Sequence, residues 1–156
     1  MFFYNKHKHD RDKMAEFNFD HIIDGIYIGN NMCCTAGLHE KLTMEGIKVN
    51  ITLEEENNDK AEGVDALIWV PVIDGLTPSE TEMRFLAKSM KGFVDAGKKI
   101  FVHCQKGHGR SGSVVMAYLL LERGMGFDEA FNTIKKQRDD IHLNTTQVAN
   151  LEKLIK

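Results

Sequence analysis

Cys104 and Arg110 are separated by five residues in the segment His-Cys-Gln-Lys-Gly-His-Gly-Arg-Ser-Gly, which spans positions 103–112. A thiolate is the reactive form of cysteine, and an arginine guanidinium is a planar fork that can bind two phosphoryl oxygens at once. Gly107 and Gly109 allow the backbone to curl so that successive N–H groups point at one anion. The spacing therefore predicts a phosphate-binding loop in which Cys104 is the nucleophile and Arg110 is the phosphate clamp.

The residues on either side indicate how this loop is held. Lys99–His103 is a short apolar run of strand length, and Ser113–Arg123 is an almost wholly apolar stretch that predicts a buried helix. The positive end of the dipole of such a helix favours an anion and a thiolate in the loop before it. We therefore expect a strand, an anion-binding loop and a helix in that order.

A second group that could take part in chemistry is Asp74. It follows the apolar run Ala66–Ile73, and Gly75 and Pro78 force a loop directly after it. In α/β sheets, ligands bind beyond the carboxyl ends of the strands, and Asp74 and Cys104 both lie at such ends. The pattern therefore brings an acidic group to the phosphate-binding loop from a distant part of the chain.

The rest of the chain alternates strands and helices. The segments Ile26–Gly29 and Ile47–Leu53 predict strands, and four segments predict helices: Cys34–Glu45 capped by Thr35, Glu80–Ala96 with a capping box of Ser79 and Glu82, Asp128–Arg138, and Thr146–Ile155. This order predicts an α/β fold with a central, mostly parallel twisted sheet flanked by helices.

The beginning of the chain has a different character. Residues 1–15 are charged and show no period, which is typical of a mobile tail, so a single domain is expected over residues 16–156. Within it, Asp20–Asn30 alternates apolar residues around an Asp-Gly pair and predicts a short hairpin or a strand entering the sheet.

The composition excludes several classes of protein. The 20 basic and 23 acidic side chains give a net charge of -3, so there is no reason to expect nucleic-acid binding through phosphate neutralisation. The longest uncharged run, Ser111–Leu121, is about half the length of a membrane-spanning helix, so no membrane span is expected. Three cysteines are too few and too unevenly placed for a disulfide-stapled secreted fold, which favours a reducing cytoplasm.

The segment at 103–112 resembles the HCxxGxxR[ST] phosphate-binding loop of the protein tyrosine phosphatase superfamily, and in particular its compact dual-specificity branch. The resemblance covers about residues 20–155: Ile26–Gly29 is similar to an early strand motif of that branch, and Glu129–Arg138 to its helix after the catalytic helix. Asp74 lies thirty residues before Cys104, in an Asp-Gly-Leu-Thr-Pro-Ser context similar to the acid loop of the branch.

This resemblance implies a phosphatase that acts on phosphotyrosine, and also on phosphoserine and phosphothreonine, in phosphorylated proteins and without a metal or cofactor. Cys104 would attack phosphorus to form a phosphocysteine while Asp74 protonates the leaving oxygen, and a water activated by Asp74 would then release phosphate. The resemblance also implies that Ser111 helps the thiolate leave and that His103 holds the loop. The phosphate-binding residues are then Gln105, Lys106, Gly107, His108, Gly109 and Arg110.

Two features depart from the common pattern of the branch. Lys106 and His108 make the loop more basic, which leaves open an acidic substrate such as a phosphoinositide, or an RNA 5′-phosphate. Leu143-Asn144 replaces the usual Pro-Asn pair, and by loose resemblance Asn144 and Gln147 would position the hydrolytic water.

Simpler interpretations remain beside these. Asp74 could be only a turn-forming aspartate, with Asp59 and Asp65 as earlier acidic alternatives. A module that captures phosphorylated partners without turnover is the non-enzymatic alternative. The pair Cys33-Cys34 is interpreted as a buried helix start, and a protective disulfide with oxidised Cys104 is an alternative that the resemblance implies.

Overall fold

The structure is a computed structural model that describes residues 16–33, 38–56, 59–60 and 62–156. Within these residues, five strands form one sheet in the order β1-β2-β5-β3-β4. The strands are β1 (Phe19–Ile23), β2 (Ile26–Gly29), β3 (Ile47–Glu54), β4 (Ala66–Val72) and β5 (Lys99–His103). Only the pair β1 and β2 is antiparallel, and the other neighbours run parallel, which confirms the predicted mostly parallel sheet.

The antiparallel pair is a hairpin closed by Asp24 and Gly25. Both residues have positive φ angles, of 56° and 76°, as a two-residue turn that follows the twist of the strands requires. The carboxylate of Asp24 accepts hydrogen bonds from the Tyr118 hydroxyl, at 2.7 Å, and from the Arg123 guanidinium. Burial and the contact with Asp24 raise the pKa of Tyr118 to about 12. The turn is thereby fixed to the helix that follows β5.

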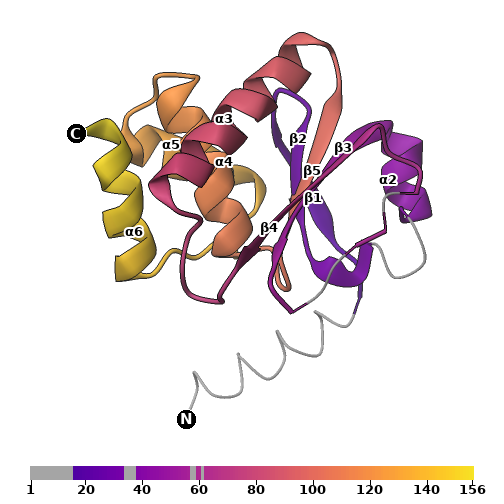
Figure 1. The fold of residues 1–156 in the computed structure, drawn as a ribbon, viewed down its shortest axis with the longest axis horizontal. Coiled ribbons are helices and arrows are strands. Elements are labelled where there is room, and N and C mark those ends of the chain that lie inside the picture. Colours follow the sequence, from indigo (N-terminus) through magenta and orange to yellow (C-terminus); the bar gives the residue numbers. More distant parts are fainter. Residues whose placement is uncertain (1–15, 34–37, 57–58, 61) are drawn as a thin grey trace.

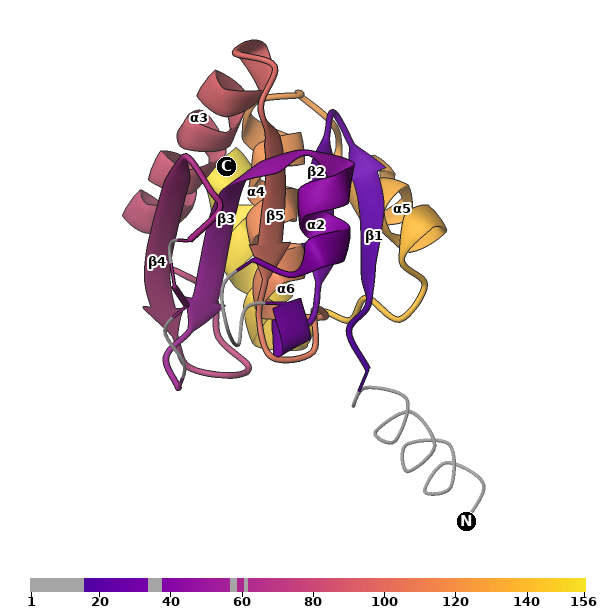
Figure 2. The ribbon, with the colours of Figure 1, turned by 90° about the vertical axis from the view of Figure 1, so that its right-hand side faces the viewer.

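The helices cover the two faces of the sheet unequally. One face carries α3 (Glu80–Asp95), α4 (Arg110–Leu121), α5 (Phe127–Gln137) and α6 (Thr145–Glu152), and α2 (Glu40–Glu45) lies on the other (Figures 1 and 2). Two short 3-10 helices, Asn31–Cys33 and Lys153–Ile155, complete the described elements. The arrangement is the predicted sheet flanked by helices.

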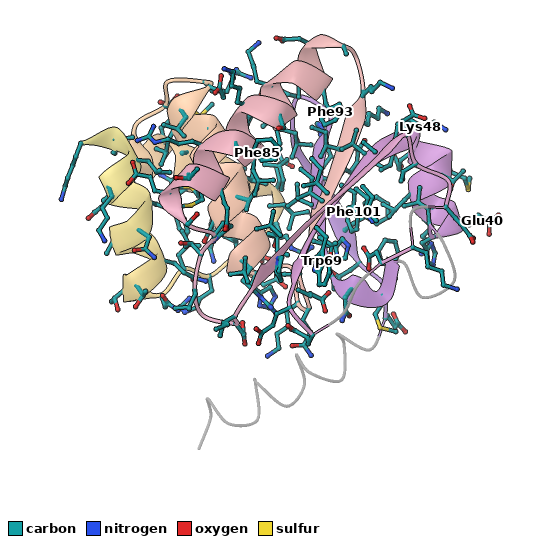
Figure 3. The ribbon with its side chains drawn as sticks, in the orientation of Figure 1. Glu40, Lys48, Trp69, Phe85, Phe93 and Phe101 are labelled. Atoms are coloured by element: carbon teal, nitrogen blue, oxygen red, sulfur yellow. The ribbon has the colours of Figure 1, made fainter. Side chains whose placement is uncertain are left out.

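Two hydrophobic clusters hold these layers together. The larger lies between the sheet and α3–α6, and the smaller joins Tyr27, Leu42, Ile47 and Phe101 beneath α2. Figure 3 marks one aromatic residue of each side, Phe93 on α3 and Phe101 on β5. Every residue of α4 except Leu121 is buried, so this helix is the centre of the larger cluster. No helix in the described part of the chain is long and apolar enough to span a membrane.

Several helix boundaries differ from the predicted ones, while the capping box of Ser79 and Glu82 and the end of α2 at Glu45 are confirmed. The helix predicted over Cys34–Glu45 begins only at Glu40, where the Nδ1 atom of His39 accepts the Lys41 N–H at 3.1 Å. Thr35, the predicted cap, lies outside the described residues.

The two helices nearest the predicted site also start earlier than their apolar patterns indicate. α4 begins at Arg110 rather than Ser113, because the Ser113 N–H already binds the Gly109 carbonyl at 2.9 Å. α6 begins at Thr145, behind a capping box formed by Asn144 and Gln147, and its last turn is 3-10. Polar residues make these first turns, and hydrophobic periodicity does not detect them.

Candidate active site

The segment between β5 and α4 folds into the loop that its sequence predicts. Cys104 is buried at the end of β5, and its Sγ atom lies 3.3 Å from the Ser111 hydroxyl in the first turn of α4. Among the described residues, no side chain caps α4 at Gly109. The free N–H groups of its first turn and the positive end of its dipole therefore face the loop, and both favour an anion there.

Gly107 meets a close steric limit inside this loop. Its φ angle is +73°, and a Cβ atom at this position would lie 2.5 Å from the carbonyl oxygen of Gly29 on β2. Both the backbone conformation and the space require glycine. The loop therefore packs directly on the edge of the hairpin.

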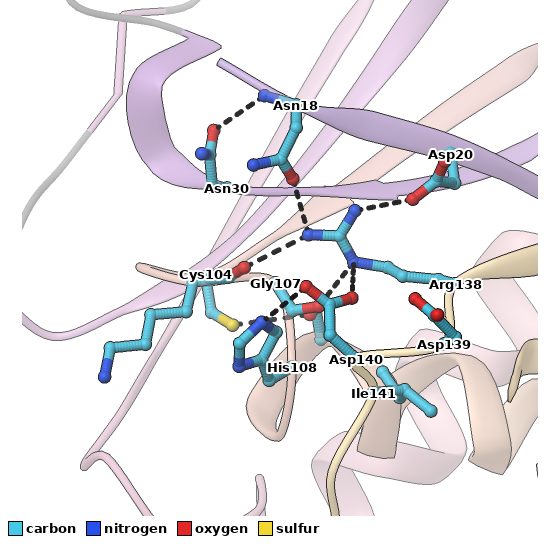
Figure 4. A network of polar contacts seen from close by, with 12 residues as sticks. Asn18, Asp20, Asn30, Cys104, Gly107, His108, Arg138, Asp139, Asp140 and Ile141 are labelled. Atoms are coloured by element: carbon cyan, nitrogen blue, oxygen red, sulfur yellow. Dashed lines mark hydrogen bonds and ion pairs between the residues drawn. The ribbon is translucent and has the colours of Figure 1, made fainter. Parts of the chain in front are cut away.

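Arg138 braces the loop from behind (Figure 4). Its Nε donates to the carbonyl of Gly107 at 2.8 Å and its Nη2 to the carbonyl of Lys106 at 3.1 Å. The same buried guanidinium donates to Asp20 at 2.8 Å and to the side-chain oxygen of Asn18 at 2.7 Å. Because the N–H of a trans peptide bond points away from its carbonyl, the N–H groups of these two peptide bonds point away from Arg138.

Arg110 is buried with only 2% of its side chain exposed, yet it is held in a defined orientation. Its Nη1 and Nη2 atoms donate to the two carboxylate oxygens of Glu56 at 3.0 and 2.8 Å, and Nη1 also donates to the Val72 carbonyl at 2.9 Å. Its Nε is buried and has no hydrogen-bond partner in the part of the chain described. Burial opposes the charge of Arg110, but the bond to Glu56 and the charges of Cys104 and Asp74 outweigh it and raise its pKa.

Asp74 lies beyond the end of β4, as the sequence predicts, and its carboxylate lies close to the guanidinium of Arg110. Its Oδ1 atom is 3.7 Å from the Nε of Arg110, while 82% of its side chain is exposed. The segment after it is tied to the start of α6, because Asn144 donates to the Gly75 carbonyl at 2.9 Å and Gln147 to the Leu76 carbonyl at 3.1 Å. The acidic side chain is thus exposed to solvent but carried by an anchored backbone.

These groups surround one cleft of about 280 Å³. Most of the predicted site residues line it: Asp74, Cys104, Gln105, Lys106, His108, Gly109, Arg110, Asn144 and Gln147. Gly107, Ser111 and His103 are buried and do not line the cleft. The structure adds Gly75 and His142 to the lining. His142 carried no signal in the sequence because it stands alone in the connection between α5 and α6.

His103 occupies a buried polar network behind Cys104. Its Nε2 contacts the carboxylate of Asp59, which also accepts from the Asn50 amide at 2.9 Å, and its Nδ1 is 3.7 Å from Glu54. Burial lowers the pKa of His103, but the two carboxylates outweigh burial and raise it. The two carboxylates therefore favour the protonated form of His103. Asp59 and Glu54 had no sequence signal beyond the acidity of their segment.

The acidic alternatives to Asp74 lie elsewhere. Asp59 is bonded to His103 behind the loop, and Asp65 is paired with Lys98 at 2.6 Å, so neither lines the cleft. His108 contacts Asp140 at 3.1 Å, and this bond keeps the pKa of Asp140 below its usual value. The Cys34 residue, the side chain of Cys33 and the segment 1–15 lie outside the described residues, so the disulfide and tail predictions remain predictions.

Comparisons with known proteins agree with this geometry. The family described as "Dual specificity phosphatase, catalytic domain" matches residues 26–155. Mouse Dual specificity phosphatase 28 is 32% identical over 139 residues, covering 86% of this chain and 82% of that protein. Human Dual specificity protein phosphatase 2 is 38% identical over 134 residues, covering 83% of this chain and 41% of that protein. The crystal structure of a mouse dual specificity phosphatase complexed with zinc tungstate matches with a TM-score of 0.76 at 27% identity, covering 87% and 85% of the two chains.

Proposed function

Because the chain belongs to the dual specificity phosphatase family, we propose that it hydrolyses phosphotyrosine, phosphoserine and phosphothreonine in proteins through a phosphocysteine at Cys104. One observation supports this most strongly. Cys104, Arg110 and Asp74 line one cleft, although they come from the end of β5, the start of α4 and the end of β4, and the Nε of Arg110 is free of hydrogen bonds among the described residues.

In the first step, the Cys104 thiolate attacks phosphorus and the bond from phosphorus to the side-chain oxygen breaks. Asp74 gives its proton to that oxygen, which leaves as the hydroxyl of the dephosphorylated residue. In the second step a water attacks phosphorus, Asp74 takes the proton of the water, and the sulfur–phosphorus bond breaks. The Ser111 hydroxyl, 3.3 Å from Sγ, donates to the departing thiolate.

Charge placement supports the transition state of both steps. The loop amides, the start of α4 and the free edge of Arg110 surround the position where the three non-bridging oxygens of the phosphoryl group would lie. These donors are already oriented by the Gly107 and Arg138 contacts, so little reorganisation is needed when charge develops. We call Asp74, Gly75 and Leu76 the acid segment. In this scheme Asn144 and Gln147 hold the acid segment through its carbonyls and face the position of the hydrolytic water.

The proposed reaction also indicates where the protein works. Cys104 is a free thiol, and thiolate chemistry requires it to stay reduced. We therefore place the reaction in the cytoplasm, where thiols are kept reduced.

A second substrate class is favoured by one observation. His142 joins Lys106 and His108 at the cleft, so three basic side chains from two segments border the phosphate position. Such a rim would also suit a lipid headgroup with several phosphates, which makes a phosphoinositide the alternative substrate. The phosphoprotein assignment remains the leading one because a relative that is 38% identical is named a dual specificity protein phosphatase.

The test is a comparison of substrates on one enzyme, with chelator and reductant present. We expect the wild type to hydrolyse para-nitrophenyl phosphate and phosphotyrosine peptides, with higher kcat/KM than for a soluble phosphoinositide, and Cys104→Ser to be inactive on all of them. Higher kcat/KM on the phosphoinositide would replace the proposed substrate. Peptide binding without turnover by the wild type would favour a binding module instead.

A further inference from the structure

The acidic connection between β3 and β4 reaches both ends of the phosphate-binding loop. Glu56 binds the Arg110 guanidinium at the end of the loop, and Asp59 binds His103 at its beginning. The two carboxylates are three positions apart on a segment that the sequence indicates only as an acidic linker. Neither of them lines the cleft.

Glu56 determines which N–H groups of Arg110 remain available. An arginine has five of them, and Glu56 and the Val72 carbonyl together occupy both N–H groups of Nη1 and one of Nη2. The remaining donors, on Nε and Nη2, share one edge of the planar guanidinium, and the Nε is buried with no hydrogen-bond partner among the described residues; Asp74 lies 3.7 Å from it. This edge matches two oxygens of a phosphoryl group.

The charge of Glu56 indicates that this residue does more than stabilise the fold. Its side chain is 40% exposed whereas that of Arg110 is 2% exposed, so the pair joins a surface carboxylate to a buried cation. Its bond to Arg110 keeps the pKa of Glu56 low, so the carboxylate stays charged near a site that binds anions. A negative charge beside an anion-binding site weakens the binding of anions, so we expect Glu56 to offset this cost through its effect on Arg110.

The contacts of Asp59 help to determine the position of Glu56. Its side chain is almost fully buried, and it contacts His103 and the Asn50 amide, which repays part of the cost of burying its charge. Asp59 is thereby held at the end of β5, next to Cys104. Glu56 follows β3 by two residues and Asp59 follows Glu56 by three, so anchoring Asp59 restricts the positions that Glu56 can take.

We propose that Glu56 and Asp59 are positioning residues of the active site: Asp59, bound to His103, limits where Glu56 can lie, and Glu56 presents the free edge of Arg110 to the phosphoryl group. The inference rests on the proposed function for its effect on turnover. It makes a separate claim about the binding of phosphate itself. Glu56 and Asp59 touch no reacting atom, so they act through Arg110 and His103.

The test measures the affinity for orthophosphate by calorimetry in the Cys104→Ser background, and kcat and KM in the otherwise wild-type enzyme. The variants are Glu56→Gln, Asp59→Asn and the double variant. Glu55→Gln is the matched control, because it removes the same charge from the neighbouring residue, whose side chain makes no contact with Arg110 in the described structure.

We expect Glu56→Gln to weaken phosphate binding and kcat/KM by roughly 10- to 100-fold at an unchanged melting temperature, as a misplaced catalytic group does. Glu55→Gln should leave both unchanged. If Glu56 acted only as a nearby negative charge, Glu56→Gln would instead tighten phosphate binding. Unchanged or tighter binding would overturn the proposal.

The double variant separates positioning from fold stability. Asp59→Asn should weaken phosphate binding when Glu56 is present and have no further effect on it in Glu56→Gln, because both act through one guanidinium. Additive losses would contradict the linkage between them. If the wild type binds phosphate but does not hydrolyse any phosphomonoester, the proposed function fails while the calorimetric comparison still decides this inference.

Discussion

At the scale of single residues, the three groups proposed to react or to bind phosphate differ in their exposure to solvent. Cys104 and Arg110 are almost fully buried, and Asp74 is the proposed reactive group that water reaches freely. In the proposed scheme Asp74 takes a proton from the hydrolytic water and must lie where water has access, whereas a nucleophile and a phosphate clamp gain from a rigid, water-poor surrounding. The difference in exposure therefore fits the different roles proposed for them.

Replacement of Asp74 tests its role directly. We expect Asp74→Asn to lower kcat by about 10²- to 10⁴-fold on a phosphotyrosine peptide and to abolish the alkaline fall of the pH–rate profile, because the proton donor is lost. Asp65→Asn is the control, since Asp65 is paired with Lys98 away from the cleft. An unchanged pH–rate profile in Asp74→Asn would mean that another group is the acid.

The buried network of His103 predicts a pH dependence of stability. The pKa of His103 is raised above its usual 6.5 in the folded state, so folding takes up a proton when the pH lies between the two values. The free energy of unfolding should therefore fall as pH rises from about 6.5 through the raised pKa. In Asp59→Asn this slope should be smaller, as measured by urea unfolding at several pH values. An equal slope in both proteins would show that His103 is not the group that titrates.

The sequence was sufficient to predict the residues of the phosphate-binding loop. It was insufficient to predict the distant residues that position this loop. Cys104 and Arg110 are separated by a fixed spacing within one loop, which a sequence displays. Glu56 and Asp59 act through contacts made 54 and 44 positions away along the chain, and their segment looks like any acidic linker. A contact of this kind follows from the sheet order, which local patterns do not specify.

At the scale of elements, the phosphate-binding loop depends on close backbone packing against the hairpin. Gly107 and Gly97 have the same φ angle of +73°, but a Cβ atom at Gly97 would meet nothing within 4 Å. Gly97→Ala should therefore lower the free energy of unfolding by about 1–2 kcal/mol and keep full activity. Gly107→Ala carries the same backbone cost and also displaces the loop from Gly29, so activity should be lost. Equal activity in the two variants would show that the loop tolerates the displacement.

The start of α6 supports two structures at once. Asn144 caps the helix and also binds the Gly75 carbonyl in the acid segment. Asn144→Ala should cost about 0.5–2 kcal/mol in unfolding free energy through the lost cap. It should also reduce turnover more on phosphoserine peptides than on para-nitrophenyl phosphate, since a basic leaving group depends more on the acid. Equal losses on both substrates would mean that only stability is affected.

These elements also show where sequence patterns lose accuracy. Strand β5 was predicted to the residue because three consecutive apolar residues between Lys99 and His103 lead directly into a glycine-rich loop. The starts of α4 and α6 were missed because the first turns, Arg110–Gly112 and the residue Thr145, are polar residues that serve the loop and the cap. Where a helix begins beside a functional site, its first residues are those that the site requires, and hydrophobic periodicity does not predict them.

At the scale of the whole molecule, the parallel order of β5, β3 and β4 brings the functional groups together. The connections after these neighbouring strands carry the loop with Cys104, the acidic connection and the acid segment, and all three leave at the same edge of the sheet. The alternation of strands and helices predicted this class of fold. The position of β2 and β1 beyond β5, which supplies Gly29 and Asp20 to the loop, became known only from the structure.

The central claim is that the phosphoryl group passes through the sulfur of Cys104, and a rapid-quench experiment tests it most directly. The enzyme is mixed with para-nitrophenyl phosphate, stopped in acid and digested, and the peptide that contains Cys104 is weighed by mass spectrometry. We predict an added mass of one phosphoryl group on this peptide, larger in amount in Asp74→Asn, where the second step lacks its base, and absent in Cys104→Ser. Turnover without any adduct at Cys104, or turnover that persists in Cys104→Ser, would contradict the account.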